Sequence, residues 1–222
     1  MQEKTLYDNS AASSSIIATN KVLKNTYILL GMTLLFSAVT AMGSMAIGLG
    51  HGASLGMWLV SMGLLIFALP RTQNSASGLL VVFAITGLLG ASMGPLLNHY
   101  LATSNGAALV AQALGGTAIV FFGLSGYALT SRKDFSFMGG FLMVGFLVVI
   151  LAAVANLFFA VPAASLAISA AVILLMSGFI LYDTSRIIHG GETNYIRATI
   201  GLYISIVNLF TSMLNLLGFM DE

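Results

Sequence analysis

Long apolar segments dominate this sequence and decide what the chain can fold into. We place them near residues 27–49, 53–69, 78–99, 107–130, 136–158, 164–188 and 198–219. A helix needs about 20 mostly apolar residues to cross a bilayer. The connections between the segments carry turn-forming residues, as in 48–52 (GLGHG) and 189–194 (HGGETN). The sequence therefore predicts an all-α integral membrane protein, a bundle of seven transmembrane helices.

Charge is too scarce for a water-exposed surface. Only 7% of the residues are charged, against about 25% in an ordinary soluble domain. The lipid bilayer is thus the expected surroundings of most side chains. The net charge of +1 argues against a nucleic-acid partner, which would require a basic patch. The absence of cysteine excludes disulfides and thiolate chemistry.

The basic residues predict the orientation, because cytoplasmic loops are enriched in lysine and arginine. With seven spans and the N-terminus inside, every Lys and Arg falls on the cytoplasmic side and none on the other. The C-terminal Asp221 and Glu222 then lie on the periplasmic or extracellular side. The eight basic residues are Lys4, Lys21, Lys24, Arg71, Arg132, Lys133, Arg186 and Arg197.

The N-terminal segment is polar and lacks the pattern of a secretory signal peptide. We predict a flexible cytoplasmic tail over residues 1–25 and a seven-helix transmembrane domain over residues 26–222. Residues 16–27 are mildly amphipathic, with Lys21 and Lys24 among apolar residues. An interfacial helix leading into the first span is therefore an alternative for that part.

Asp183 is the one acid that lies clearly within a predicted span, about one turn before the end of the sixth. Arg186 follows three residues later and can share its helix face. Ionisable residues inside membranes are rare and are often functional. Two interpretations stay open: a local ion pair near the interface, or a gate or latch whose contacts depend on protonation of Asp183.

The seventh predicted helix carries a polar stripe. Ser205, Asn208, Ser212 and Asn215 recur at spacings that place them within an arc of roughly 80°. A polar stripe should face protein or water rather than lipid, so this helix is expected inside the bundle. The stripe either forms interhelical hydrogen bonds or lines a polar path.

Nothing in the sequence forms a catalytic or cofactor-binding pattern. His51, His99 and His189 belong to different loops and to opposite membrane sides, so they do not form a metal site. There is no phosphate-binding loop, nucleophile elbow or pair of intramembrane carboxylates. We expect no enzyme activity and no cofactor. Glycine pairs such as Gly52 and Gly56, or Gly90 and Gly94, are expected to allow close helix packing.

Five segments together resemble the bacterial Bax-inhibitor-1 family, also called the transmembrane Bax-inhibitor-motif family, and within it the YccA-like branch. The resemblance covers nearly the whole chain. It rests on residues 182–198 (YDTSRIIHGGETNYIRA), 202–210 (LYISIVNLF), 21–27 (KVLKNTY), 94–98 (GPLLN) and 132–137 (RKDFSF).

The resemblance implies a seven-helix fold with the last helix at its centre and a location in the bacterial inner membrane. The YccA-like branch is associated with restraining the FtsH-type ATP-dependent protease of that membrane. A modulator, or inhibitor, of such a protease is therefore the first function expected here. Proteases of this type pull on flexible cytoplasmic tails, so residues 1–20 would be the segment that is gripped.

The resemblance also implies an alternative function, a pH-sensitive leak channel for calcium or other cations. Such family members have two acids near the cytoplasmic mouth and an arginine partner from the second helix. Asp183 matches the first acid and Arg71 matches the arginine, whereas Ser205 stands in place of the second acid. Because two carboxylates can share a proton and a single one beside arginine should stay ionised, we expect a weak or absent proton-gated leak.

Overall fold

The computed structural model describes the backbone of residues 2–221 and the side chains of residues 19–221. In this part of the chain all regular structure is helical, with no strand. The elements are α1 (Gln2–Ala46), α2 (His51–Gly63), the π-helical turn η1 (Leu64–Ala68), α3 (Leu69–Thr72), α4 (Ser77–Ser92), α5 (Gly94–Leu101), α6 (Gly106–Ser131), the 3-10 turn η2 (Ser136–Met138), α7 (Gly139–Phe159), α8 (Pro162–Ile188) and α9 (Tyr195–Asp221).

Seven of the helical stretches are long and apolar enough to cross a membrane, which confirms the predicted count. Most boundaries lie within a few residues of the predicted ones. The first span ends a few residues earlier than expected, at Ala46, and its helix α1 continues toward the N-terminus beyond the predicted start. The spans are Thr19–Ala46, His51–Thr72, Ser77–Leu101, Gly106–Ser131, Ser136–Phe159, Pro162–Ile188 and Tyr195–Asp221.

Two spans are interrupted near a proline. The second consists of α2, η1 and α3, and Pro70 lies in the first turn of α3. Proline lacks an N–H and its ring disturbs the preceding turn, and the wider π-helical turn accommodates this. The third span changes direction at Met93, between α4 and α5, just before Pro95. These interruptions keep the chain helical but bend it.

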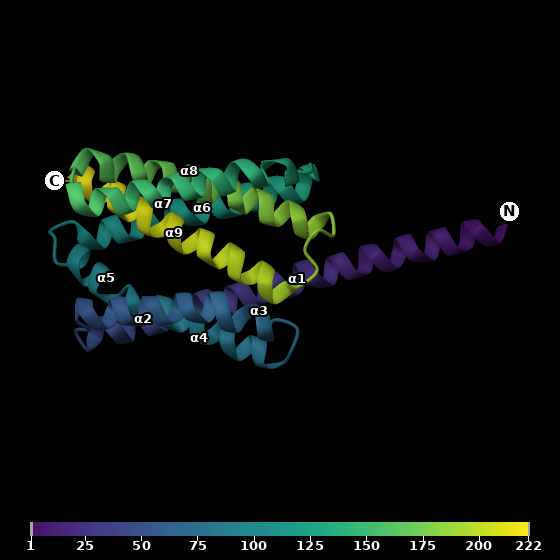
Figure 1. Cartoon of the computed structure of the whole chain (residues 1–222), viewed down its shortest axis with the longest axis horizontal. Coiled ribbons are helices and arrows are strands. Elements are labelled where there is room, and N and C mark those ends of the chain that lie inside the picture. Colours follow the sequence, from purple (N-terminus) through teal and green to yellow (C-terminus); the bar gives the residue numbers. More distant parts are fainter. Residues whose placement is uncertain (1, 222) are drawn as a thin grey trace.

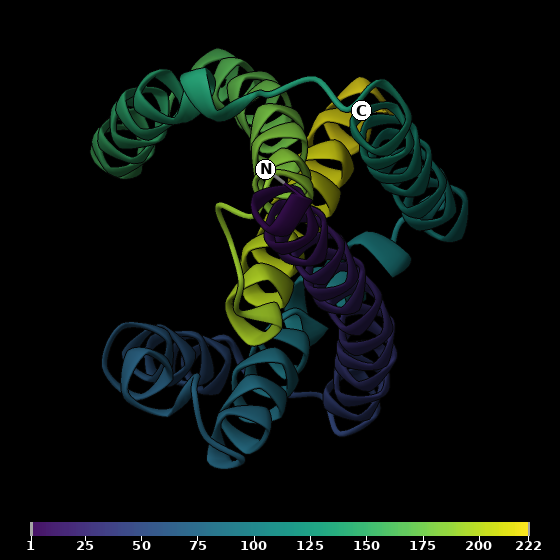
Figure 2. The ribbon, with the colours of Figure 1, turned by 90° about the vertical axis from the view of Figure 1, so that its right-hand side faces the viewer.

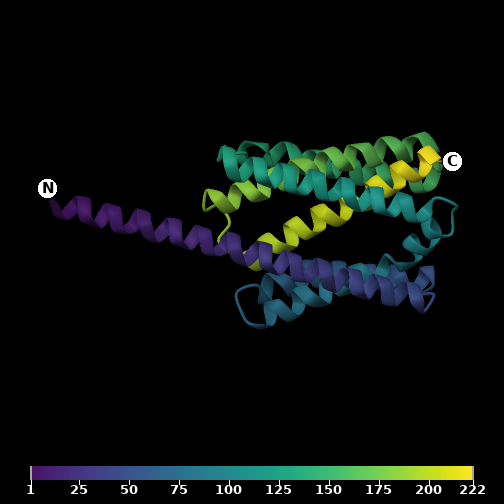
Figure 3. The same cartoon turned by 180° about the vertical axis from the view of Figure 1, so that it is seen from behind.

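Helix α9 occupies the centre of the bundle (Figure 2) and has the largest buried share of all seven spans. It contacts α1, α4, α6 and α8. In Figures 1 and 3 it crosses obliquely between a group formed by α1 to α5 and a group formed by α6, α7 and α8. The two groups are therefore joined mainly through α9.

A buried tyrosine connects α9 to the first group. Tyr203 is fully buried, and its hydroxyl lies 2.6 Å from Ser37 Oγ on α1. The same hydroxyl donates a hydrogen bond of 3.1 Å to the carbonyl oxygen of Thr86 on α4. Ser37 must then donate to Tyr203, so one side chain satisfies polar groups from two neighbouring helices.

The glycine pairs have two different environments. A Cβ atom at Gly90 or Gly94 would overlap α1, at Ser37 and Ser44 respectively. These two glycines therefore allow α1 to lie directly against α4 and α5, as expected. A Cβ atom at Gly52 or Gly56 would have no atom within 4 Å. Both glycines are exposed, and no neighbouring helix among the described residues packs against them.

Helix α1 extends well beyond the bundle toward its N-terminus (Figure 1). The predicted boundary at residue 25, between a flexible tail and the membrane domain, stays a prediction. The side chains of residues 1–18 lie outside the described part of the chain.

Candidate functional site

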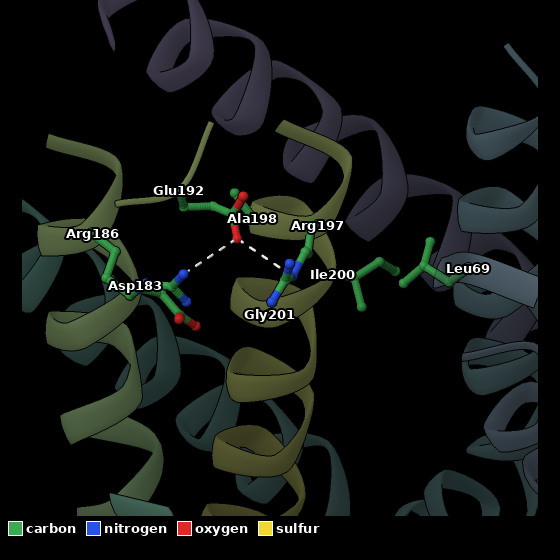
Figure 4. A pocket seen from close by; sticks show the side chains of 8 residues that line it. All are labelled: Leu69, Asp183, Arg186, Glu192, Arg197, Ala198, Ile200 and Gly201. Carbon is green, nitrogen blue, oxygen red and sulfur yellow. Dashed lines mark ion pairs between the residues drawn. The ribbon is translucent and has the colours of Figure 1, made fainter. Parts of the chain in front are cut away.

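A pocket of about 240 Å³ opens where α8, α9 and the loop between them meet α3 (Figure 4). It lies at the end of the bundle that carries the basic residues, which we call the basic end. Four of its lining residues are ionisable, and the others are small or apolar. The lining consists of Leu69, Asp183, Arg186, Glu192, Arg197, Ala198, Ile200 and Gly201.

Asp183 is placed on the side of α8 that faces α9. A Cβ atom added to Gly201 would come within 2.9 Å of its Oδ2 atom. The absence of a side chain at Gly201 therefore lets α9 lie against the carboxylate. In the described part of the chain Asp183 takes part in no ion pair.

Glu192 is the centre of the ion pairs in this pocket (Figure 4). Its Oε2 atom lies 3.7 Å from Arg186 Nη2 and 3.5 Å from Arg197 Nε. The Glu192 side chain is 11% exposed, whereas that of Arg197 is 58% exposed. A carboxylate so far from water needs compensating charge, and arginines from two helices supply it.

The loop between α8 and α9 holds Glu192 in this position. Gly190 adopts the left-handed conformation, with φ of 74°, and reverses the chain after α8. The backbone N–H of Glu192 then donates to the carbonyl oxygen of Arg186, and Arg186 Nη2 donates to that of Gly191. The loop is therefore folded back onto the last turn of α8.

Asn194 fixes the other end of this loop. Its Oδ1 atom accepts hydrogen bonds from the N–H groups of Ile196 and Arg197 and so caps α9. Its Nδ2 atom donates to the carbonyl oxygen of Gln73 and to Asn74 Oδ1 in the loop after α3. Asn194 thus ties the pocket to the other helix group.

The linker between α6 and α7 is fastened to the end of α8, beside the pocket. Ser185 Oγ accepts the N–H of Phe135, and His189 Nε2 lies 3.1 Å from the carbonyl oxygen of Arg132. In this linker the hydroxyl and the backbone N–H of Ser136 hold the pKa of Asp134 below its ordinary value. The nearby His189 adds to this effect.

The three residues of the predicted gate or latch are only partly brought together. Asp183 and Arg186 line the same pocket, but Arg186 pairs with Glu192. Arg71 is exposed, does not line the pocket, and donates to the carbonyl oxygen of Phe67 in its own helix. A latch made of these three residues stays a prediction.

The polar stripe of α9 faces the bundle along most of its length. Ser205 and Ser212 are buried, and Ser205 Oγ donates to the carbonyl oxygen of Gly201. Asn208 likewise donates to its own helix, at Ile204. Asn215 is exposed and accepts a hydrogen bond of 2.8 Å from the Tyr100 hydroxyl. A polar path along this stripe also stays a prediction.

Sequence reasoning missed the roles of Glu192 and Arg197. Both lie close to Asp183 and Arg186 in the sequence. Charged residues are rare in this chain, so four of them in one short segment could have indicated a shared site. In the described part of the chain no group of three or more His, Asp or Glu residues could hold a metal ion.

Comparison with known proteins identifies the family. The model of the family described as inhibitor of apoptosis-promoting Bax1 matches residues 19–222. The chain belongs to this family, the Bax-inhibitor-1 family. This confirms the resemblance seen in the sequence.

Two relatives of this Bax-inhibitor-1 protein are similar to it over nearly their whole length. A membrane protein of Vibrio cholerae is 52% identical over 217 residues, which are 98% of this chain and 97% of the relative. A protein of Escherichia coli K12 named modulator of FtsH protease YccA is 51% identical over 214 residues, 96% of this chain and 97% of that one. The chain is thus a YccA-like, seven-span membrane protein.

Proposed function

We propose that this protein is an inhibitory modulator of an FtsH-type ATP-dependent protease in the bacterial inner membrane. The observation that carries the proposal is its 51% identity, over 96% of its length, to the E. coli modulator of FtsH protease. The packing of α1 in the bundle adds a physical reason why a protease that holds this chain would extract it slowly.

The projecting part of α1 is the segment that the protease would grip. It leaves the bundle at the basic end, which faces the cytoplasm in the predicted orientation (Figure 1). Pulling on it would draw α1 away from α4 and α9, against which it packs. The buried hydrogen bond of Ser37 with Tyr203 and the partly buried one of Ser44 with the carbonyl oxygen of Ala91 oppose that movement. A chain that is gripped but extracted slowly would keep the protease occupied.

Deletion of residues 2–18 tests this role and keeps the stretch Thr19–Ala46, which is long and apolar enough to cross the membrane by itself. We expect the deletion to abolish crosslinked co-purification with the protease from native membranes and to slow turnover of the protein. A matched variant, in which a Gly/Ser sequence of equal length replaces residues 2–18, distinguishes recognition of the sequence from the mere presence of a tail. If the deletion changed neither binding nor turnover, the proposed grip would be wrong.

The cation-leak function is not part of this proposal. Its pH-sensitive form requires two nearby carboxylates, and Ser205 occupies the second position with its hydroxyl bonded to Gly201. Glu192, the other carboxylate of the pocket, is held by two arginines. Calcium flux into liposomes across the neutral pH range is expected to show no steep pH dependence. A steeply pH-dependent leak that Asp183→Asn abolished would favour the cation-leak function over the protease-modulator function.

A further inference from the structure

A second pocket, of about 290 Å³, lies at the opposite end of the bundle from the Asp183 pocket. Its lining residues belong to α5, the first part of α8 and the last turns of α9, which lie toward the C-terminal end of the molecule (Figure 1). None of its lining residues carries a carboxylate, and its polar groups are hydroxyl, amide and imidazole. The lining consists of His99, Tyr100, Ser165, Leu166, Ser169, Asn215, Gly218 and Phe219.

Ser169 is a buried hydrogen-bond donor that faces this pocket. The residue is only 7% exposed, and its hydroxyl has no hydrogen-bond partner among the described residues. Ser177, on the same helix, instead donates to the carbonyl oxygen of Ile173 in the preceding turn. Because the Ser169 hydroxyl opens onto the pocket and not onto another helix, it is available to a ligand there that carries a hydrogen-bond acceptor.

The start of α8 adds a positive electrostatic potential to the pocket. Pro162 opens this long helix, and the first-turn N–H groups of a helix lack partners within it. The aligned peptide dipoles favour negative charge at such an end. Ser165, in the first turn, lines the pocket one helical turn before Ser169, so both side chains lie on one face. Its Oγ atom accepts a hydrogen bond of 2.7 Å from Asn156 Nδ2, which leaves the Ser165 O–H able to donate.

Helix α9 contributes a further donor. Asn215 Oδ1 accepts the Tyr100 hydroxyl, and its NH₂ group has no hydrogen-bond partner among the described residues. The Tyr100 ring lies directly against Gly218, where a Cβ atom would overlap it. This close packing fixes the position of Tyr100 and with it the orientation of the Asn215 amide.

We propose that this pocket binds a phosphate group. Two serine hydroxyls, an amide NH₂ and the positive end of α8 are all suited to an acceptor-rich anion, and no lining carboxylate opposes one. A cation would find no charged ligand here, and a neutral ligand would gain little from the helix dipole. The group can belong to a phospholipid, since the pocket lies at the end of three membrane spans, or to free phosphate. This inference does not depend on the proposed role toward a protease.

The test uses the purified full-length chain in detergent with two kinds of probe. Native mass spectrometry compares phosphatidylglycerol with a diacylglycerol that has the same acyl chains but no phosphate. Thermal unfolding compares inorganic phosphate with chloride at equal ionic strength. Ser169→Ala removes the buried donor, and Ser177→Ala on the same helix is the matched control. We expect Ser169→Ala to weaken phosphate-group binding about tenfold or more, and Ser177→Ala to leave it unchanged.

The outcomes separate the two sources. Binding of phosphatidylglycerol without a response to inorganic phosphate identifies a lipid headgroup, and a response to inorganic phosphate that Ser169→Ala removes identifies free phosphate. Equal binding of the lipid and the diacylglycerol would overturn the proposal. So would binding that survives both Ser169→Ala and Ser169→Leu, which fills the pocket.

Discussion

Glu192, in the loop between α8 and α9, connects these two helices through its carboxylate. It lies outside any span, yet it joins the end of α8 to the start of α9 through Arg186 and Arg197. Because its side chain is nearly buried, loss of the negative charge leaves two guanidinium groups close together without the carboxylate that they share.

We predict that Glu192→Gln lowers the free energy of unfolding by about 1–2 kcal/mol, a moderate value because Arg197 is largely in water. Thermal unfolding in detergent measures the change. Asp134→Asn is the matched control, since this exposed carboxylate forms no ion pair among the described residues and an amide oxygen can still accept the N–H of Ser136, so we expect a change within about 0.5 kcal/mol. Equal effects of the two substitutions would show that the Glu192 pairs do not stabilise the fold.

The pairing of Glu192 could not be predicted from the sequence, although Asp183 and Arg186 could be placed on one helix face. Spacing along a helix determines which residues are neighbours on that helix. The partner of Arg186 is decided instead by how the loop folds back at Gly190 and is fastened by Asn194. Arg71 illustrates the same limit, because its side chain bonds to its own helix and its position depends on the bend at Pro70.

At the scale of single elements, the contact of α4 with α1 depends on residues without side chains. Gly90 lies against the backbone of Ser37 so closely that a methyl group would overlap its carbonyl oxygen. Backbone atoms cannot move aside as the end of a flexible side chain can, so the helices would have to separate.

Gly90→Ala is therefore expected to destabilise the protein by about 1–3 kcal/mol. Gly115→Ala on α6 is the control, because a Cβ atom there has no atom within 4 Å. Thermal unfolding of both variants in the same detergent provides the comparison. A loss of stability in the control as large as that of Gly90→Ala would point to a general effect of the added methyl group rather than to helix packing.

The elements themselves were largely predictable. Apolar length gives seven spans because a bilayer accepts few alternatives to a continuous helix. The polar stripe predicted an interior position for the last helix, and Ser205 and Ser212 are indeed buried. The π-helical turn before Pro70 and the break at Met93 were not predicted, since both lie inside segments that remain apolar throughout.

At the scale of the whole molecule, all seven Lys and Arg residues with described side chains belong to the basic end. The orientation that follows from them remains a prediction, and the chain offers a direct test because it contains no cysteine. Thr193 and Ser104 are exposed in connections at opposite ends of the bundle.

We expect a single cysteine at Ser104 to react with a membrane-impermeant maleimide in intact cells. A single cysteine at Thr193 should react only after permeabilisation. The physical reason is the preference of basic segments for the cytoplasmic side. Each variant serves as the control for the other, and the reverse pattern of labelling would place the N-terminus outside.

The central position of α9 has a consequence for biosynthesis. The helix that joins the two groups follows all the others described in the chain, so α1, α4, α6 and α8 are synthesised before the helix that they all contact. Until then Ser37 lacks its partner Tyr203, and Asn74 lacks Asn194. A truncated or stalled chain would keep these groups unsatisfied and its two groups of helices loosely joined. Insertion of α9 is therefore the step that closes the structure, and copies that lack α9 would expose unpaired polar groups that membrane quality control can detect.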